Sequence, residues 1–229
     1  MSLFLSTSLL LFYYIEIIKR KSNYQIMTNS EIVKYSKSTL KGKYSKVILP
    51  YLIVSIIVSI PQNQEFISII ISKLRIPGIV LFLIWGFLIN PALNVGLATF
   101  SLAIVRGKEI NIKYLFKGFR FLSKSAAVGL LYLLIIIIGI VLFIIPGIIW
   151  ALMFSQVFFI LSENQDLGIK EIFKKSARIM KGNKLKLLGL FLRFFLFIIL
   201  SVFTLFIWSL WLIPQLYVSY AKFYDLIKD

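Results

Sequence analysis

The segment from Ser125 to Ser162 constrains this chain more than any other, because its 38 residues include no charged side chain. A bilayer span needs about 20 apolar residues, so this segment is long enough for two spans. A helix in a soluble core has an apolar stripe and a polar face, whereas this segment is apolar on all sides. We therefore expect an integral membrane protein. The Pro146-Gly147 pair in the middle of the segment predicts two short helices that fold against each other.

The composition of the whole chain agrees with a membrane protein and argues against an enzyme. Hydrophobic residues make up 59% of the chain. Its 229 residues are enough for about six or seven short spans and leave no room for a separate soluble domain. The chain has no Cys and no His, which excludes thiol nucleophiles, disulfides, imidazole metal sites and His acid-base catalysis. It also lacks a phosphate-binding Gly-rich loop, a nucleophile elbow and a pair of intramembrane carboxylates. We predict a non-enzymatic protein with no catalytic residue, no metal and no cofactor.

The net charge of +17 would suggest nucleic-acid binding in a soluble protein, but here the basic residues flank the apolar segments. Of the 26 Lys and Arg residues, 23 lie in four segments, at residues 19–46, 106–124, 170–186 and 222–228. Positively charged loops stay on the cytoplasmic side of a membrane. We therefore predict that these segments, and with them the C-terminus, are cytoplasmic and that the loop from Pro61 to Pro77 lies on the other side. No nucleic-acid partner is expected.

Three of the basic segments are predicted to form amphipathic helices on the membrane surface. The first has the spacing of a capping box at Thr28 and Glu31. In each helix the apolar residues share one face and the basic residues another, which is typical of helices that lie over anionic headgroups. The basic residues that we expect at the lipid interface are Lys34, Lys37, Lys41, Lys113, Lys117, Arg120, Lys124, Lys170, Lys174, Arg178 and Lys181.

The first three basic segments belong to an internal repeat. Each contains a Lys-Gly pair, at residues 41–42, 117–118 and 181–182, and each leads into apolar sequence that meets a proline, at Pro91, Pro146 and Pro214. The predicted fold is all-α: a polytopic bundle of six transmembrane helices in three hairpins, each preceded by a basic interfacial helix. Residues 27–229 form a single transmembrane domain. Residues 1–26 are either an additional N-terminal anchor helix or an upstream extension.

Several polar or helix-breaking residues inside the apolar segments are candidate functional residues. Arg193 is a candidate ligand contact, but its position about two turns beyond Lys186 favours the alternative, in which its long side chain reaches the cytoplasmic interface. The neutral candidates for a polar pathway are Asn90, Asn94, Gln156 and Gln215, whose alternative role is to hydrogen-bond neighbouring helices. The candidate hinges are Pro91, Pro146, Gly147 and Pro214. A proline in the first turn of a returning helix is also an ordinary structural choice.

A family resemblance follows from motifs spread over the chain. They are MTNSEIVKYSKSTLKGKYSK from Met27, NPALNVGLATFSLAIVRGKE, LFKGF, IIPGIIWALMFSQVFFIL, KSARIMKGNK and LWLIPQLYVSYAKFYDL. With these motifs the chain resembles a bacterial integral-membrane family known as domain of unknown function nine hundred and seventy-five, from Met27 to the C-terminus. The resemblance implies a six-helix protein of the bacterial inner membrane. It supplies no catalytic residue.

Taken together, these features favour a membrane protein that engages anionic lipid through its basic helices and other membrane proteins through its apolar ones. Protection against membrane-active peptides fits this class. The alternative is a small permease, or the membrane subunit of a transport complex whose ATPase is a separate chain, because the sequence has no nucleotide-binding motif.

Overall fold

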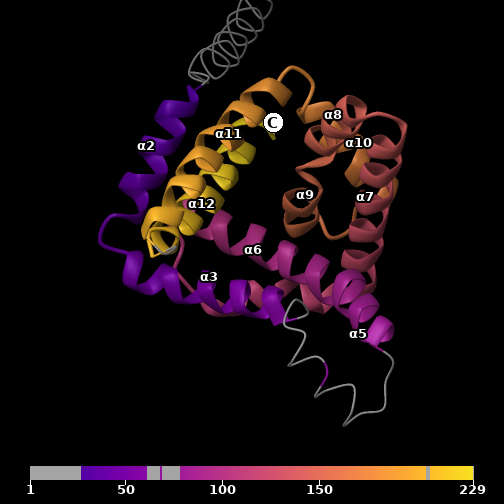
Figure 1. The fold of residues 1–229 in the computed structure, drawn as a ribbon, viewed down its shortest axis with the longest axis horizontal. Helices are drawn as coiled ribbons and strands as arrows, with labels where there is room; N and C mark the ends of the chain where they lie inside the picture. The colour runs from indigo at the N-terminus through magenta and orange to yellow at the C-terminus, as the bar shows by residue number, and fades with distance from the viewer. Residues whose placement is uncertain (1–26, 61–67, 69–77, 205–206, 229) are drawn as a thin grey trace, which may run out of the picture.

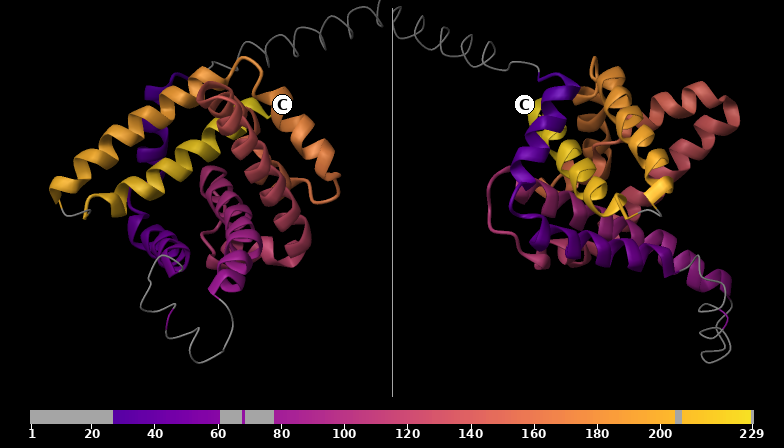
Figure 2. Two further views of the ribbon diagram at one scale, coloured as in Figure 1. Left: turned by 45° about the vertical axis from the view of Figure 1, so that its right-hand side comes forward. Right: turned by 60° about the vertical axis from the view of Figure 1, so that its left-hand side comes forward.

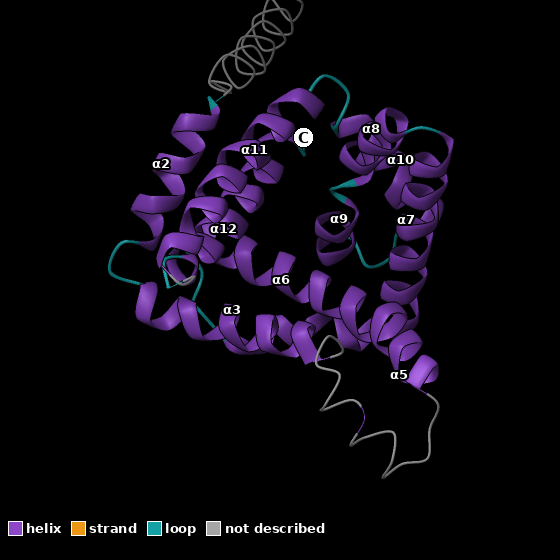
Figure 3. Cartoon of the chain, in the orientation of Figure 1, coloured by secondary structure: helices purple, strands orange, loops and turns teal. Residues whose placement is uncertain are grey.

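The computed structural model describes residues 27–60, 68, 78–204 and 207–228. Residues 1–26, which are the predicted anchor or extension, and the loop from Pro61 to Pro77 apart from Ser68 lie outside the described residues. The described part of the chain consists of helices and turns without any strand, which confirms the all-α prediction (Figure 3).

The elements follow the order that the apolar and basic segments predict (Figure 1). They are α2 (Asn29–Leu40), α3 (Tyr44–Ser59), α5 (Gly78–Ile84), the π-helix η2 (Trp85–Ile89), α6 (Asn90–Val105), the 3-10 helix η3 (Ile112–Phe121), α7 (Leu122–Leu142), α8 (Ile144–Phe154), α9 (Val157–Glu163), α10 (Ile169–Ile179), α11 (Lys184–Leu200), the 3-10 helix η4 (Ser201–Thr204) and α12 (Ser209–Ile227).

Three helical stretches in the described part are long and apolar enough to cross a membrane: Trp85–Val105, Ile112–Leu142 and Ile144–Glu163. A fourth arises if α2 and α3, which meet at a bend of 108°, are counted as one span. Of the apolar window in Trp85–Val105, 72% is buried within the protein, compared with 17% in Ile112–Leu142. The first stretch is therefore the centre of the bundle, and the second presents most of its apolar surface to the surroundings.

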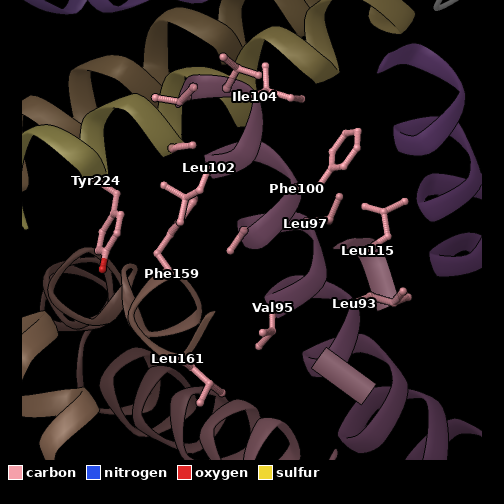
Figure 4. Packing of buried hydrophobic residues seen from close by; sticks show 14 of the residues in the cluster. Leu93, Val95, Leu97, Phe100, Leu102, Ile104, Leu115, Phe159, Leu161 and Tyr224 are labelled. Atoms are coloured by element: carbon pink, nitrogen blue, oxygen red, sulfur yellow. The ribbon is translucent and has the colours of Figure 1, made fainter. Parts of the chain in front are cut away.

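The core forms around α6, which runs through the middle of the molecule (Figure 1). Figure 4 shows Leu93 and Phe100 of α6 on the side of Leu115 in η3, and Leu102 on the side of Phe159 in α9 and Tyr224 in α12. Each of these side chains is at least nine-tenths buried. Bulky apolar side chains enclosed in this way supply most of the packing that holds the bundle together.

Helices α7 and α8 form the hairpin that the uncharged segment predicts. They approach most closely at two glycines, because a Cβ added to Gly139 would lie 2.8 Å from the Cα of Gly147. Small residues allow membrane helices to approach closely in this way. The tip of the hairpin is strongly exposed, with Val141 at 78% and Phe143 at 74% relative accessibility. Gly147, one of the candidate hinges, thus forms a packing contact with Gly139.

Pro91 and Pro146 do not mark the helix breaks directly, because each of these two breaks lies just before its proline. The chain is extended at Phe143, and Pro146 is the third residue of α8. The π-helix η2 ends one residue before Asn90-Pro91. A proline ring clashes with the carbonyl of the residue four positions earlier, so an α-helix has to widen or stop ahead of it.

Pro214 differs from the expected position in the first turn. It is the sixth residue of α12, whereas the preceding α-helix, α11, ends at Leu200 and is followed by η4. The break in this apolar segment therefore precedes Ile213-Pro214 by more than a turn, and Pro214 is a buried residue inside a continuous helix.

The first and third basic segments share a local structure, with equivalent residues 140 positions apart. In both, the backbone N–H of the residue just before the helix donates to an acidic side chain three residues later, from Thr28 to Glu31 and from Gly168 to Glu171. Both end in a turn at Gly42 or Gly182, where φ is +75° and +84°. Buried residues correspond as well, in the pairs Ile32 and Ile172, Ser36 and Ser176, Leu40 and Met180, Val47 and Leu187, and Val54 and Phe194.

The middle Lys-Gly pair is not an equivalent turn. Gly118 lies inside η3 and is buried against α6, where a Cβ would lie 2.1 Å from the carbonyl oxygen of Ala92. The structure thus supports a helix-turn-helix repeat for two of the three expected units, and the six-helix arrangement in three hairpins stays a prediction. The views in Figure 2 show α11 and α12 running side by side in opposite directions.

Candidate functional site

Most of the basic residues expected at the lipid interface are exposed. These are Lys34, Lys37, Lys41, Lys113, Arg120, Lys170, Lys174, Arg178 and Lys181. The two others are half-buried and bonded to backbone carbonyls at the end of α9: Lys117 Nζ donates to Ser162 O at 3.4 Å, and Lys124 Nζ donates to Gln165 O. The last carbonyls of a helix have no partner within it, so Lys117 completes the C-terminus of α9, and Lys124 binds the turn that follows it.

The element η3 combines exposed apolar and basic side chains on the same surface. Ile112, Phe116 and Phe119 are 37–46% exposed, and Lys113 and Arg120 beside them are exposed too. The rings of Phe116 and Phe119 lie 6.2 Å apart. Aromatic groups next to cations are typical of a segment that lies at the boundary between headgroups and acyl chains.

The helices α2 and α10 use their apolar faces differently from η3. Ile32 and Leu40 of α2, and Ile172 and Phe173 of α10, are buried inside the protein. These two helices therefore attach to the bundle and expose chiefly their basic faces. Among the three basic segments, η3 is the one whose apolar residues are largely free to meet lipid.

A small pocket of about 270 Å³ opens beside η3, where it meets the ends of α6 and α9. Its polar lining includes Arg106, Lys108, Lys117, Tyr114 and Glu163. In this lining Arg106 is paired with Glu163 and Lys117 is bonded to Ser162 O, so Lys108 is the basic group that has no partner in the described part of the chain.

Arg106 also joins three helix ends in an ionic network. Its guanidinium lies 2.6 Å from Glu163 at the end of α9 and 2.7 Å from Asp225 near the end of α12. Lys228 lies 3.3 Å from Asp225, and the Tyr224 hydroxyl donates to Glu163 at 2.8 Å. The network holds the C-terminal ends of α6, α9 and α12 together.

The charges in this network change the acidity of Asp225. Partial burial of the carboxyl opposes ionisation, but the hydrogen bond and charge of Arg106, together with Lys228, hold the pKa of Asp225 below its ordinary value. Asp225 is therefore ionised at neutral pH, and the network depends on that charge.

The second candidate site is a cavity of about 530 Å³ in the middle of the bundle. Asn90 and Asn94 line it together with Tyr132, Tyr217 and Tyr220. Asn94 Nδ2 donates to the side-chain oxygen of Asn90 at 2.8 Å and to its backbone oxygen at 3.0 Å. The structure thus brings together two of the residues expected in a polar pathway and adds three tyrosines to them.

A second cavity shares lining residues with this one, and a third shares lining residues with the second. A cavity of about 140 Å³ has Asn90, Asn94 and Tyr217 in common with it and extends to Tyr51 and Ser55 of α3. Tyr51 and Ser55 in turn line a groove of about 970 Å³ between α3 and α12. A row of adjoining spaces therefore crosses the bundle from α3 to α7.

The other intramembrane candidates lie elsewhere. Gln156 is buried between α8 and α9, with its Nε2 donating to Ser155 Oγ and its Oε1 without a partner in the described part of the chain. Gln215 Nε2 contacts Val33 O at 3.5 Å, and Arg193 is half-buried on α11. None of these three is among the residues that line the central cavity.

Sequence reasoning missed the tyrosines and the ionic network. The tyrosines lie in apolar helices, where an aromatic residue is ordinarily a packing residue. The acidic residues Glu163 and Asp225 could have been noted, because they are acids at the ends of apolar segments in a chain with only nine acids. Their shared partner Arg106 is 57 and 119 residues away, and no local pattern reveals it.

Comparisons with known proteins bear on the C-terminal half. Searches of curated proteins and of solved structures found no match to this chain. A family model described as "Protein of unknown function (DUF975)" matches residues 122–229, which extend from the start of α7 to the C-terminus. The resemblance that the motifs indicated is thereby confirmed for these residues, whereas residues 27–121 lie outside the match. From α7 onward, the chain is similar to the DUF975 family.

Proposed function

We propose that this chain is a non-enzymatic, polytopic protein of the bacterial inner membrane that engages anionic lipid through basic surfaces on the cytoplasmic side. The observation that carries the proposal is η3, where Phe116 and Phe119 are exposed next to Lys113 and Arg120. Insertion of the aromatic rings below the headgroups would hold the basic groups at phosphate level, so the apolar and electrostatic terms add.

The proposed topology has six crossings, with all basic segments on one side. It is supported by the ionic network, because Arg106, Glu163 and Asp225 lie at or near the C-terminal ends of three returning helices and meet at one end of the bundle. The basic segments at η3 and α10 adjoin that same end, at the start of α7 and the end of α9. The bend of 108° between α2 and α3 fits a surface helix that leads into a crossing helix.

Topology is tested by labelling single cysteines in intact cells, which the cysteine-free chain makes direct. Lys113→Cys and Lys181→Cys should be protected from an impermeant maleimide until the membrane is permeabilised. Asn63→Cys, in the loop on the opposite side, should react at once. Labelling of positions 113 and 181 on opposite sides would contradict the topology.

Lipid engagement is tested in nanodiscs that contain phosphatidylglycerol and phosphatidylcholine. The variant Lys113→Gln/Arg120→Gln should lose enrichment of phosphatidylglycerol around the protein, measured with spin-labelled lipids, and the wild-type enrichment should fall with added salt. The matched control Lys170→Gln/Lys174→Gln removes the same charge from α10, whose apolar face is buried, and should have a smaller effect. Wild-type enrichment in the η3 variant would contradict the proposal.

Protection against a membrane-active peptide belongs to the same proposal, since a protein anchored in anionic lipid is located where cationic peptides accumulate. Cells that produce the protein would then survive such a peptide better than cells that produce the η3 variant.

A second candidate function, the membrane component of a transport system, is favoured by the row of adjoining cavities from α3 to α7. Copurification with a separate ATPase would support it. In a transport role, Asn94→Leu would block flux without altering enrichment of phosphatidylglycerol.

A further inference from the structure

The central cavity has an uncharged polar wall and an apolar remainder. Besides the asparagines and tyrosines, its lining includes Phe87, Leu97 and Leu133. Its volume of about 530 Å³ lies within the range of small-ligand pockets, which are mostly apolar with a few convergent polar groups. Leu133 is 43% exposed on α7, so this wall of the cavity reaches the lipid-facing surface.

Several hydrogen-bonding atoms in the cavity are not used by the protein. Within the described part of the chain, Asn94 Oδ1 and Asn90 Nδ2 have no hydrogen-bond partner, although the other halves of the two amides are paired with each other. The hydroxyls of Tyr217 and Tyr220 are also unpaired there, and none of these atoms is among the fully buried ones. An acceptor, a donor and two hydroxyls are thus available to a ligand.

The chemistry of the wall selects against a charged ligand. Every residue that lines this cavity in the described part of the chain is neutral. A phosphate or ammonium group would lose its hydration there without gaining a counterion, which costs far more than neutral hydrogen bonds return. A hydroxyl group, in contrast, can donate to Asn94 Oδ1 and accept from Asn90 Nδ2 or a tyrosine.

The depth of the asparagines agrees with an uncharged headgroup. Asn94 is 12 residues before Arg106, and at 1.5 Å per helical residue this amounts to roughly 18 Å from the basic end of α6. In a hydrocarbon core about 30 Å thick, the site is below the headgroups of the opposite leaflet. A lipid with a small neutral headgroup can reach that depth with its acyl chains in the bilayer.

We infer that this cavity binds an uncharged lipid with a free hydroxyl group, of the diacylglycerol class, with the hydroxyl at Asn90, Asn94, Tyr217 and Tyr220. The lipid enters from the side past Leu133, and its chains remain against the exposed apolar surface of α7. This site is separate from the basic surface of η3, and its ligand is chemically different.

The test uses the full chain in nanodiscs and a diacylglycerol that carries a diazirine in one acyl chain. Its matched probe has the same chains but an acetylated hydroxyl. After irradiation, peptide mapping should find the free-hydroxyl lipid on α6, α7 and α12, with the acetylated lipid at about threefold to tenfold lower yield, as expected for one or two lost hydrogen bonds in a membrane.

The variants Tyr217→Phe, Tyr220→Phe and Asn94→Leu should each lower labelling by the free-hydroxyl lipid toward the level of the acetylated one. Tyr44→Phe is the matched control, because Tyr44 in the first turn of α3 is outside the cavity, and it should label like the wild type. The tyrosine variants keep the ring and its packing, so a loss of labelling with an unchanged melting temperature reports on the hydroxyl.

Three results would overturn the inference: equal labelling by the two probes, unchanged labelling in the tyrosine and Asn94 variants, or equal competition by phosphatidylglycerol of the same chain length. Efficient competition by an amphipathic peptide but not by unlabelled diacylglycerol would also overturn it and would identify a peptide site instead.

Discussion

The carbonyl group of Leu115 lies directly against Gly96, so that a Cβ added to this glycine would be 1.7 Å from the Leu115 oxygen. A second glycine repeats the contact from the other side, because Gly118 of η3 lies against the backbone of Ala92 in α6. The buried core helix and the surface element are thus in direct backbone contact at two points.

Gly96→Ala should therefore destabilise the protein by about 1–3 kcal/mol, because the obstacle is backbone and cannot rotate away. Gly118→Ala should do the same, and both variants should unfold at lower temperature in detergent. Gly86→Ala is the control, since its Cβ would meet nothing within 4 Å. If Gly96→Ala melted at the wild-type temperature, α6 and η3 would have to be farther apart than this backbone contact requires.

Arg106→Gln should loosen the junction of α6, α9 and α12. Hydrogen bonds to charged groups contribute roughly 1.5–3 kcal/mol, and here one guanidinium serves two carboxylates. A double-mutant cycle with Glu163→Gln should give a coupling energy of about 0.5–3 kcal/mol. Additive effects of the two substitutions on unfolding would mean that the pair is not coupled in solution.

The pH dependence of this junction follows from Asp225. Since its pKa is lowered in the folded protein, the charge of Asp225 contributes stability above the ordinary carboxyl pKa of about 3.9, and this contribution disappears as the pH falls through the folded-state value. The melting temperature should therefore fall when the pH is lowered from about 6 to about 3. This fall should be larger in the wild type than in Asp225→Asn. Parallel pH profiles would argue against the ionic role of Asp225.

Substitutions of the turn glycines Gly42 and Gly182 should lower the stability of the protein through backbone strain alone. Both have positive φ, and a Cβ at either position would meet nothing within 4 Å. Ala at position 182 should therefore cost about 1–2 kcal/mol, whereas Asn, which adopts this conformation more readily, should cost less. Thermal unfolding of Gly182→Ala, Gly182→Asn and Gly182→Val should rank them Asn, Ala, Val in decreasing stability, and the same order is expected at Gly42.

The sequence was informative where a single segment determines the structure. The uncharged segment from Ser125 to Ser162 predicts the α7–α8 hairpin, and Thr28 with Glu31 predicts the start of α2, where the Glu31 carboxylate accepts from Thr28 N at 2.6 Å. Proline located the breaks only approximately, because the clash with the carbonyl four residues earlier shifts the distortion ahead of Pro91 and Pro146.

The candidate sites were only partly predictable, because they depend on which helix faces meet. Asn90 and Asn94 are one turn apart and share a face, so their pairing follows from helical spacing. The separation of Gln156 and Arg193 from the cavity depends on the rotation of α8, α9 and α11 in the bundle, which is decided by packing between distant segments. Lys117 and Lys124 likewise bind backbone carbonyls because the end of α9 packs beside them, and α9 is distant from them in the sequence.

The Arg106 junction has a consequence for biosynthesis. Arg106 at the end of α6 pairs with Glu163 of α9 and Asp225 of α12, and the ribosome makes α12 last of the described helices. During translation Arg106 and Glu163 can pair early, but the junction cannot close until the segment around Asp225 has left the exit tunnel. In a nascent chain stalled before that point, α6 and α9 would lack their ionic contact with α12. Such a chain would be cleaved by quality-control proteases more readily than the finished protein.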